Sequence, residues 1–273
     1  MKSAAFFDLD RTLISGASIF PFAIESWRQG LASGREVAGW ALDAAAFKLL
    51  GETEDRNEEA RSAMLGKVAG VSVEKLADIG EAVLPKLVAR LRPESRKLVE
   101  MHRQAGRDTW IASASPQEIV EPLARALDMT GAIGTRGKIV DGHYTDELDG
   151  PFCHGPGKAE AVGLVAIRQG YDLATSYAYS DAIGDLPLLD LVGHPVAVNP
   201  DSQLTQVARE RGWPVVVFAR KTKQAVAWSA LGVSAASFTA VAYVLGRRHG
   251  RTATLVGLAD GRISLPGLQL RQS

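Results

Sequence analysis

Residues 3–14 read SAAFFDLDRTLI and join an apolar run to two carboxylates. The run SAAFFDL at residues 3–9 is typical of a buried strand whose carboxyl end opens into a loop. Asp8 and Asp10 are two residues apart at that end, so both carboxylates can reach one reaction centre if the loop turns. The stretch therefore predicts the first strand of a sheet with a polar site at its end.

From residue 108 onward, strand-like and helix-like stretches alternate. We predict strands at 108–112, 132–136, 176–179, 195–199 and 214–218, helices at 116–127, 158–169, 185–191 and 201–211, and a hairpin at 138–145. Alternation with short loops favours a Rossmann-like, mostly parallel α/β sheet, in which ligands bind at the carboxyl ends of the strands.

Residues 17–104 have a different pattern, because apolar residues recur there at spacings of three and four. Trp27, Trp40 and the stretch 73–92 follow this spacing, which predicts several helices. We therefore expect a core formed by residues 1–16 and 105–219, an inserted helical region at 17–104 and a tail at 220–273.

The 31 basic and 31 acidic residues cancel overall but are unevenly distributed. Residues 1–205 carry 21 Lys and Arg against 29 Asp and Glu, whereas residues 206–273 carry 10 against 2. Residues 224–246 contain no charged residue, and as a helix they would be about 34 Å long, enough to cross a hydrocarbon core of about 30 Å. We expect an apolar helix that either associates with a membrane or packs on protein. The basic tail fits an anionic membrane surface or an acidic partner better than nucleic acid.

Four further polar residues occur at predicted strand ends or helix starts. Ser113 follows the strand 108–112, and Lys158 begins a helix after Gly155-Pro156-Gly157. Asp181 and Asp185 follow the strand 176–179. A hydroxyl beside free amides at a helix start favours an anion. Crowded carboxylates need a divalent cation and a lysine to neutralise them, and the lack of neighbouring His or Cys favours Mg²⁺ over Zn²⁺.

Four motifs in this order carry a family resemblance: FFDLDRTLI (6–14), WIASASP (110–116), GPGKAEAV (155–162) and YSDAIGDLPLL (179–189). Together they resemble the haloacid dehalogenase (HAD) superfamily over residues 3–218, and most of all its subfamily IB of phosphoserine-phosphatase-like hydrolases. The resemblance implies a Mg²⁺-dependent phosphomonoester hydrolase. It also implies that region 17–104 is an inserted helical cap of the C1 type, which closes over the site and selects the substrate.

The resemblance assigns roles to four residues in the reaction. Asp8 would be the nucleophile that forms an aspartyl-phosphate. Asp10 would be the general acid for the leaving oxygen and then the base for water. Ser113 and Lys158 would hold phosphate oxygens.

The resemblance also implies a metal site. Asp8, the main-chain carbonyl of Asp10 and Asp181 would bind Mg²⁺. Thr12 would orient the loop of the first motif, and Asp185 would support the metal site or contact Lys158.

Three positions depart from the family pattern. Arg11 replaces a small residue, and Ser180 stands where glycine is common. Phosphoserine phosphatases carry an acid soon after the first motif, whereas residues 15–18 here are SGAS and the first acid is Glu25. We therefore expect a small or lipid-like phosphomonoester as substrate rather than phosphoserine.

Two other functions fit the same sequence. One is a regulatory or scaffolding protein on a HAD fold, whose site binds a ligand or is vestigial. The other is a phosphotransferase, in which an alcohol takes the place of water. With no secretory leader at the start of the sequence, we expect a cytoplasmic protein, attached to the inner face of the membrane if residues 224–246 provide the contact.

Overall fold

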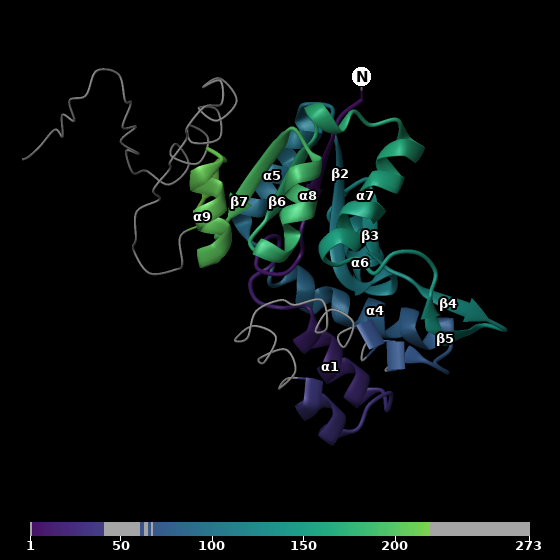
Figure 1. Cartoon of the computed structure of the whole chain (residues 1–273). Helices are drawn as coiled ribbons and strands as arrows, with labels where there is room; N and C mark the ends of the chain where they lie inside the picture. Colours follow the sequence, from purple (N-terminus) through teal and green to yellow (C-terminus); the bar gives the residue numbers. More distant parts are fainter. Residues whose placement is uncertain (1, 41–60, 63–64, 67, 219–273) are drawn as a thin grey trace, which may run out of the picture. The chain divides into compact units, whose positions relative to one another are not determined.

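The computed structural model describes residues 2–40, 61–62, 65–66 and 68–218 (Figure 1). The strands are β1 (Ala4–Phe7), β2 (Asp108–Pro116), β3 (Gly131–Thr135), β4 (Gly137–Val140), β5 (His143–Leu148), β6 (Tyr177–Ser180), β7 (His194–Val198) and β8 (Val215–Val216). The helices are α1 (Ile19–Arg28), α4 (Val73–Val88), α5 (Pro93–Gln104), α6 (Gln117–Ala126), α7 (Gly155–Gln169), α8 (Leu186–Leu191) and α9 (Ser202–Glu210), with short 3₁₀ turns at Leu173–Thr175 and Ile183–Asp185. The predicted mostly parallel α/β core and the hairpin are confirmed.

Six parallel strands form the main sheet in the order β3-β2-β1-β6-β7-β8. The chain builds one half outward from β1 to β3 and then returns to lay β6 against the other side of β1. β1 and β6 therefore meet where the strand order reverses, and Phe7 is in register with both Ile111 and Tyr179. Ligands of open α/β sheets bind beyond the strand ends at such a reversal.

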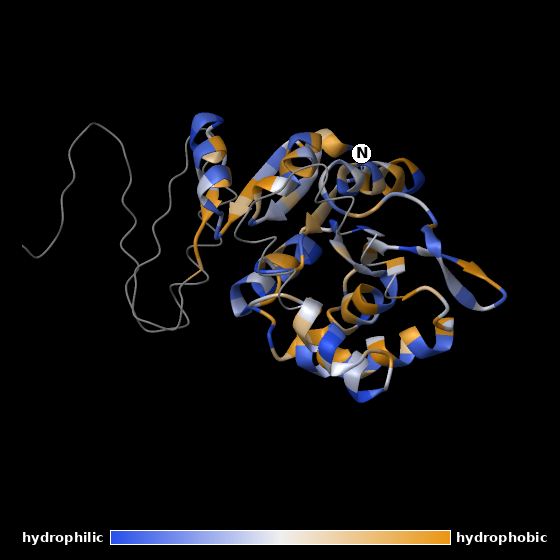
Figure 2. Cartoon of the chain, turned by 60° about the horizontal axis from the view of Figure 1, so that its bottom comes forward, coloured by the Kyte–Doolittle hydropathy of each residue, from blue (hydrophilic) through white to orange (hydrophobic). Residues whose placement is uncertain are grey.

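β1 is buried along its whole length because helices cover both faces of the sheet. Ala4 and Phe6 belong to the apolar cluster of one face, whereas Phe7 stacks on Tyr179 at a ring distance of 4.6 Å and packs edge-on against His102 of α5. In Figure 2 the helices show alternating hydrophobic and hydrophilic bands, as expected for helices with one buried side. The cluster around Ala4 and Phe6 also includes Val162 of α7, Leu188 of α8 and Leu204 of α9.

Helices α1 and α4 lie at the carboxyl end of the sheet (Figure 1). α4 packs on α1 and α6, whereas α5 packs on β1 and β2. The two chain segments that lead into and out of the helical region run side by side, since the amide of Ser15 donates to the carbonyl of Arg90 at 2.8 Å and that of Arg92 to Leu13 at 2.9 Å. The division at 17–104 stays a prediction, but this packing groups α5 with the sheet.

Most elements differ from their predicted limits by one or two residues at an end, and two larger differences bear on the site. β2 continues from Ala112 to Pro116 after a shift in register, so Ser113 lies within the strand rather than at its end. α7 begins at Gly155 instead of residue 158, with Pro156 in its first turn, where a missing amide hydrogen costs no hydrogen bond. A Cβ on Gly157 would lie 2.1 Å from the carbonyl oxygen of Phe152, so glycine allows this close approach.

No helix in the described part of the chain is long and apolar enough to cross a membrane. The apolar helix predicted at 224–246 and the tail 220–273 lie outside the described residues, so both stay predictions.

Gly80 brings α4 into contact with α6, and its replacement tests that contact. A Cβ at this position would lie 2.1 Å from the carbonyl oxygen of Glu118, whereas Gly163, in the interior of α7, has open space around it. We expect Gly80→Ala to lower the free energy of unfolding by about 1–3 kcal/mol through overpacking. Gly163→Ala should raise it by about 0.5–1 kcal/mol through helix propensity. Urea denaturation measures both, and equal effects would contradict the packing described.

Candidate active site

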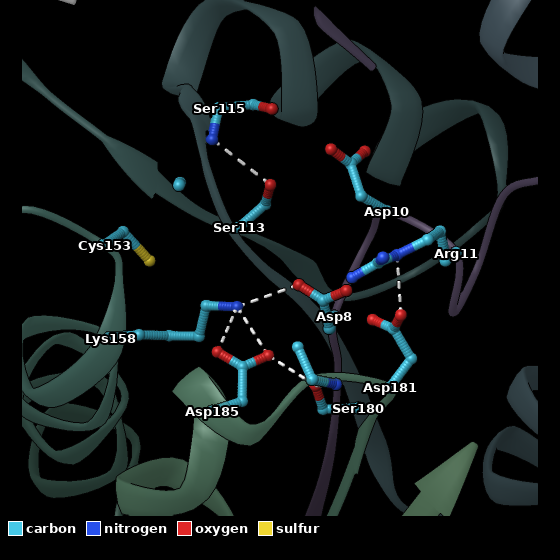
Figure 3. A network of polar contacts seen from close by, with 12 residues as sticks. Asp8, Asp10, Arg11, Ser113, Ser115, Cys153, Lys158, Ser180, Asp181 and Asp185 are labelled. Carbon is cyan, nitrogen blue, oxygen red and sulfur yellow. Dashed lines mark hydrogen bonds and ion pairs between the residues drawn. The ribbon is translucent and has the colours of Figure 1, made fainter. Parts of the chain in front are cut away.

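Asp8 and Asp181 lie next to each other in the fold because their strands are neighbours. Asp8 directly follows β1, and Asp181 directly follows β6. The amide of Asp8 donates to the carbonyl of Tyr179 at 2.9 Å, which continues the ladder between the two strands. Both side chains are buried. The reversal point of the sheet thus holds two carboxylates (Figure 3).

Lys158 from α7 reaches into this cluster and joins two of its acids. Its Nζ lies 2.8 Å from Oδ1 of Asp8 and 2.7 Å from Oδ1 of Asp185, and only 3% of its side chain is exposed. The Ser180 hydroxyl donates to Oδ2 of Asp185 at 2.5 Å. The contact of Asp185 with Lys158 was one of the two arrangements predicted. Ser180 was noted only as a departure from the family pattern, and the structure shows what it contacts.

Asp10 is held from the start of the helical region. Its Oδ1 accepts a hydrogen bond from the amide of Ser18 at 2.8 Å. The hydroxyls of Ser18 and Ser115 lie 2.9 Å apart, and the amide of Ser115 donates to the hydroxyl of Ser113 at 3.2 Å. These contacts connect Asp10 to the loop of the second motif. Ser18 and Ser115 are not among the predicted site residues, although Ser115 stands inside the motif WIASASP.

Arg11 forms an ion pair with Asp181 that is absent from the predicted contacts of the site. Its Nε lies 2.7 Å from Oδ2 of Asp181. The Arg11 backbone has a φ of +62°, in the left-handed region. Figure 3 shows this side chain entering the cluster from the side of Asp10.

Thr12 and Ser113 are both buried near the carboxylates but make different contacts. The hydroxyl of Thr12 has no hydrogen-bond partner among the described residues, and its carbonyl accepts from the Ser95 hydroxyl of α5 at 2.6 Å. Ser113 lies two residues beyond Ile111, the register partner of Phe7, which brings it to the same sheet edge as Asp8. Their predicted roles, orienting the loop and holding phosphate, stay predictions.

The cluster contains more negative charge than its own cations neutralise. In the part of the chain that the structure describes, the cations that pair with carboxylates of the group Asp8, Asp10, Asp181 and Asp185 are Lys158 and Arg11. Burial raises the pKa of Asp8 to about 7, with Lys158 opposing the change and Asp185 adding to it. Burial and then the charge of Asp8 raise the pKa of Asp181 to about 8. Such carboxylates favour an additional cation.

The donor atoms fit Mg²⁺ rather than a softer metal. No group of three or more His, Cys, Asp and Glu side chains in the described ranges is arranged to hold a metal ion by itself. Mg²⁺ is usually bound by one or two carboxylates, with water and substrate phosphate completing its shell. Asp8 and Asp181 supply two carboxylates, each with one oxygen outside the ion pairs, and the predicted third ligand is the Asp10 carbonyl.

Cys153 lies beside the cluster but is unsuited to be a nucleophile. Its thiol is buried and donates to the carbonyl of Ile133 at 3.3 Å. Burial raises its pKa to about 12, so the reactive thiolate is scarce at neutral pH. The carboxylates remain the candidates for covalent chemistry.

A sequence model of the haloacid dehalogenase-like hydrolases matches residues 5–190. The phosphoserine phosphatase SerB1 of Mycobacterium tuberculosis is 40% identical over 256 residues, which cover 92% of this chain and 82% of that protein. A histidinol-phosphatase of Neisseria meningitidis is 33% identical over 237 residues, covering 80% of this chain and all of that protein. The solved structure of a protein of unknown function from Bordetella pertussis superposes with a TM-score of 0.69 at 30% identity, covering 79% of this chain and 98% of that one.

The raised pKa values predict how stability depends on pH when EDTA removes divalent cations. Asp8 and Asp181 keep their protons to about pH 7 and 8 in the folded protein, whereas in the unfolded chain they lose them near pH 4. Stability should therefore fall as pH rises from about 4 to 8, by at most about 1.4 kcal/mol per pH unit for each carboxyl.

Asp181→Asn should flatten this dependence, because an amide does not titrate. Asp128→Asn, which removes an exposed carboxylate, is the control and should keep the wild-type slope. Urea unfolding at several pH values measures the slopes. Equal slopes in wild type and Asp181→Asn would show that burial does not raise the pKa of Asp181, and would contradict the prediction.

Proposed function

This chain belongs to the haloacid dehalogenase-like hydrolases, and on that premise we propose that it is a Mg²⁺-dependent phosphomonoester hydrolase that acts through an aspartyl-phosphate on Asp8. Its relatives include proteins named as phosphatases, which supports phosphomonoesters as the substrate class. The observation that carries the proposal is the contact of Asp8 with buried Lys158 beside Asp181. Subfamily IB, predicted from the motifs, is part of the proposal.

Asp8 is suited to be the nucleophile because it presents a carboxylate at the end of β1. Lys158 holds Oδ1 at 2.8 Å, which leaves Oδ2 outside the ion pair. In the first step an oxygen of Asp8 attacks phosphorus, an O–P bond forms, and the bond from phosphorus to the leaving oxygen breaks. Lys158 and Ser113 would bind the other phosphate oxygens and offset their charge.

Asp10 is suited to move the proton in both steps. Burial raises its pKa, although the hydrogen bonds from Ser18 oppose the change, so a larger protonated fraction is kept near neutral pH. The proton of Asp10 goes to the leaving oxygen in the first step. In the second step water attacks phosphorus, its proton returns to Asp10, and cleavage of the bond to Asp8 releases inorganic phosphate.

Three groups would hold Mg²⁺, namely the carboxylates of Asp8 and Asp181 and the main-chain carbonyl of Asp10. When bound, the ion would compensate the negative charge of the phosphate and the carboxylates. The excess of four carboxylates over two cations supports this assignment.

The substrate proposal rests on the first acid of the helical region. Glu25 lies 2.5 Å from Nζ of Lys86 and 3.9 Å from Arg28, so its charge is already balanced within the cap. An acid that recognises a substrate amine should instead be free of such partners. Although SerB1 is named a phosphoserine phosphatase, we propose a small or lipid-like phosphomonoester other than phosphoserine. A lipid-like substrate would agree with the predicted membrane attachment through residues 224–246.

Phosphate release from a panel of phosphomonoesters tests the proposed chemistry. We expect release to require Mg²⁺ and to fall about a thousandfold or more in Asp8→Asn, because an amide is not a nucleophile. Asp146→Asn, which removes an exposed carboxylate of β5, should leave the rate unchanged. Release that persists in Asp8→Asn would contradict the mechanism.

The same panel ranks the substrates by kcat/KM. It contains phosphoserine, histidinol phosphate, sugar phosphates and lipid phosphates. Phosphoserine should fall at least about tenfold below the best substrate, which corresponds to about 1.4 kcal/mol of transition-state binding. Phosphoserine as the best substrate would overturn the substrate proposal and leave the chemistry intact.

A further inference from the structure

Arg11 has a backbone conformation that its residue type rarely adopts. Its φ of +62° lies in the left-handed region, which glycine adopts without strain and which costs energy for a residue with a Cβ. Its amide donates to the carbonyl of Gly16 at 3.1 Å, so the turn of the first motif imposes this conformation. Strained backbone conformations of this kind cluster at functional sites of proteins.

In this backbone conformation the side chain of Arg11 forms an ion pair with Asp181. Nε of Arg11 lies 2.7 Å from Oδ2, and 5% of the Asp181 side chain is exposed. The positive charge of Arg11 opposes the rise that burial causes in the pKa of Asp181. Arg11 is thus the ion-pair partner of Asp181, whose pKa the charges of Asp8 and Asp185 raise and that of Lys158 lowers less than that of Arg11.

The two cations of the cluster differ in how firmly they are held. The Lys158 side chain is 3% exposed and lies between two carboxylates. Its movement to solvent would leave the buried charges of Asp8 and Asp185 unpaired. The Arg11 side chain is 43% exposed, and among the described residues its ion-pair partner is Asp181. Arg11 can therefore move to solvent, where the guanidinium is hydrated, and Lys158 cannot.

We propose that Arg11 is a displaceable counter-ion that competes with the divalent cation for Asp181. This inference rests on the proposed function, in which Asp181 is a Mg²⁺ ligand. Mg²⁺ binds carboxylate oxygens directly, at about 2.0–2.1 Å. A guanidinium on the same carboxylate takes up a lone pair and repels the divalent charge. Arg11 thereby lowers the affinity for the metal, because it holds Oδ2 of Asp181 and repels the divalent charge, and it neutralises Asp181 while the metal is absent.

Isothermal titration with Mg²⁺ and no substrate tests this competition. Arg11→Asn removes the charge and keeps a residue that tolerates a positive φ. We expect it to bind Mg²⁺ about tenfold more tightly than wild type, a difference of about 1.4 kcal/mol. Arg11→Lys keeps a cation and should stay closer to wild type than Arg11→Asn.

The matched control is Arg125→Asn, which removes an equally simple ion pair, that of Arg125 with Glu81 on the surface of α6 and α4. Its affinity for Mg²⁺ should equal that of wild type. Arg11→Gly is the second variant, and it should repeat the gain in affinity if Arg11→Asn folds poorly.

Two results would overturn the inference, and they are distinguishable. If wild type, Arg11→Asn and Arg11→Gly bind Mg²⁺ equally well, the competition is absent and the proposed function still stands. If none of them binds Mg²⁺ and none releases phosphate, the proposed function fails and the inference fails with it.

Discussion

Lys158 places a positive charge inside the protein, 2.8 Å from Asp8 and 2.7 Å from Asp185. Burying an ammonium group costs several kcal/mol unless its partners are close and well oriented, so α7 must begin against the ends of β1 and β6. Gly157 makes this possible, because any Cβ there would collide with the carbonyl of Phe152. The position of the helix, the loop before it and the nucleophile candidate are thus linked through one side chain.

The strand order creates the opposite problem, an excess of negative charge. Because β1 and β6 are neighbours, Asp8 and Asp181 are forced together at their carboxyl ends. Desolvation raises the pKa values of both. The charges of Asp185 and Asp10 add to the rise at Asp8, and the charge of Asp8 adds to the rise at Asp181. Two described cations do not balance four carboxylates. A site with this excess of negative charge is suited to bind a divalent cation together with a phosphate, since the cation offsets the charge of the carboxylates and of the phosphate.

The sequence allowed the core and its motif residues to be predicted because these depend on local patterns. An apolar run followed by Asp8 specifies a buried strand with a polar end, and alternation after residue 108 specifies parallel strands. The ion pair of Arg11 with Asp181 could not be predicted, because it depends on how a side chain after β1 is oriented toward a residue after β6. The packing of α5 on β1 and β2 could not be predicted either, since helices that pack on a sheet and helices that pack on other helices share the same periodicity.

In the proposed reaction the phosphoryl group passes through Asp8. Asp10→Asn should slow attack by water on the intermediate, because the amide cannot take the proton of the water. The variant is mixed with Mg²⁺ and p-nitrophenyl phosphate, whose leaving group needs no proton from Asp10, then quenched in acid and digested, and mass spectrometry locates the phosphoryl group. We expect a phosphorylated peptide with the modification on Asp8, absent when Asp8→Asn is added. Phosphate release with no modification at Asp8, or with one at another residue, would contradict it.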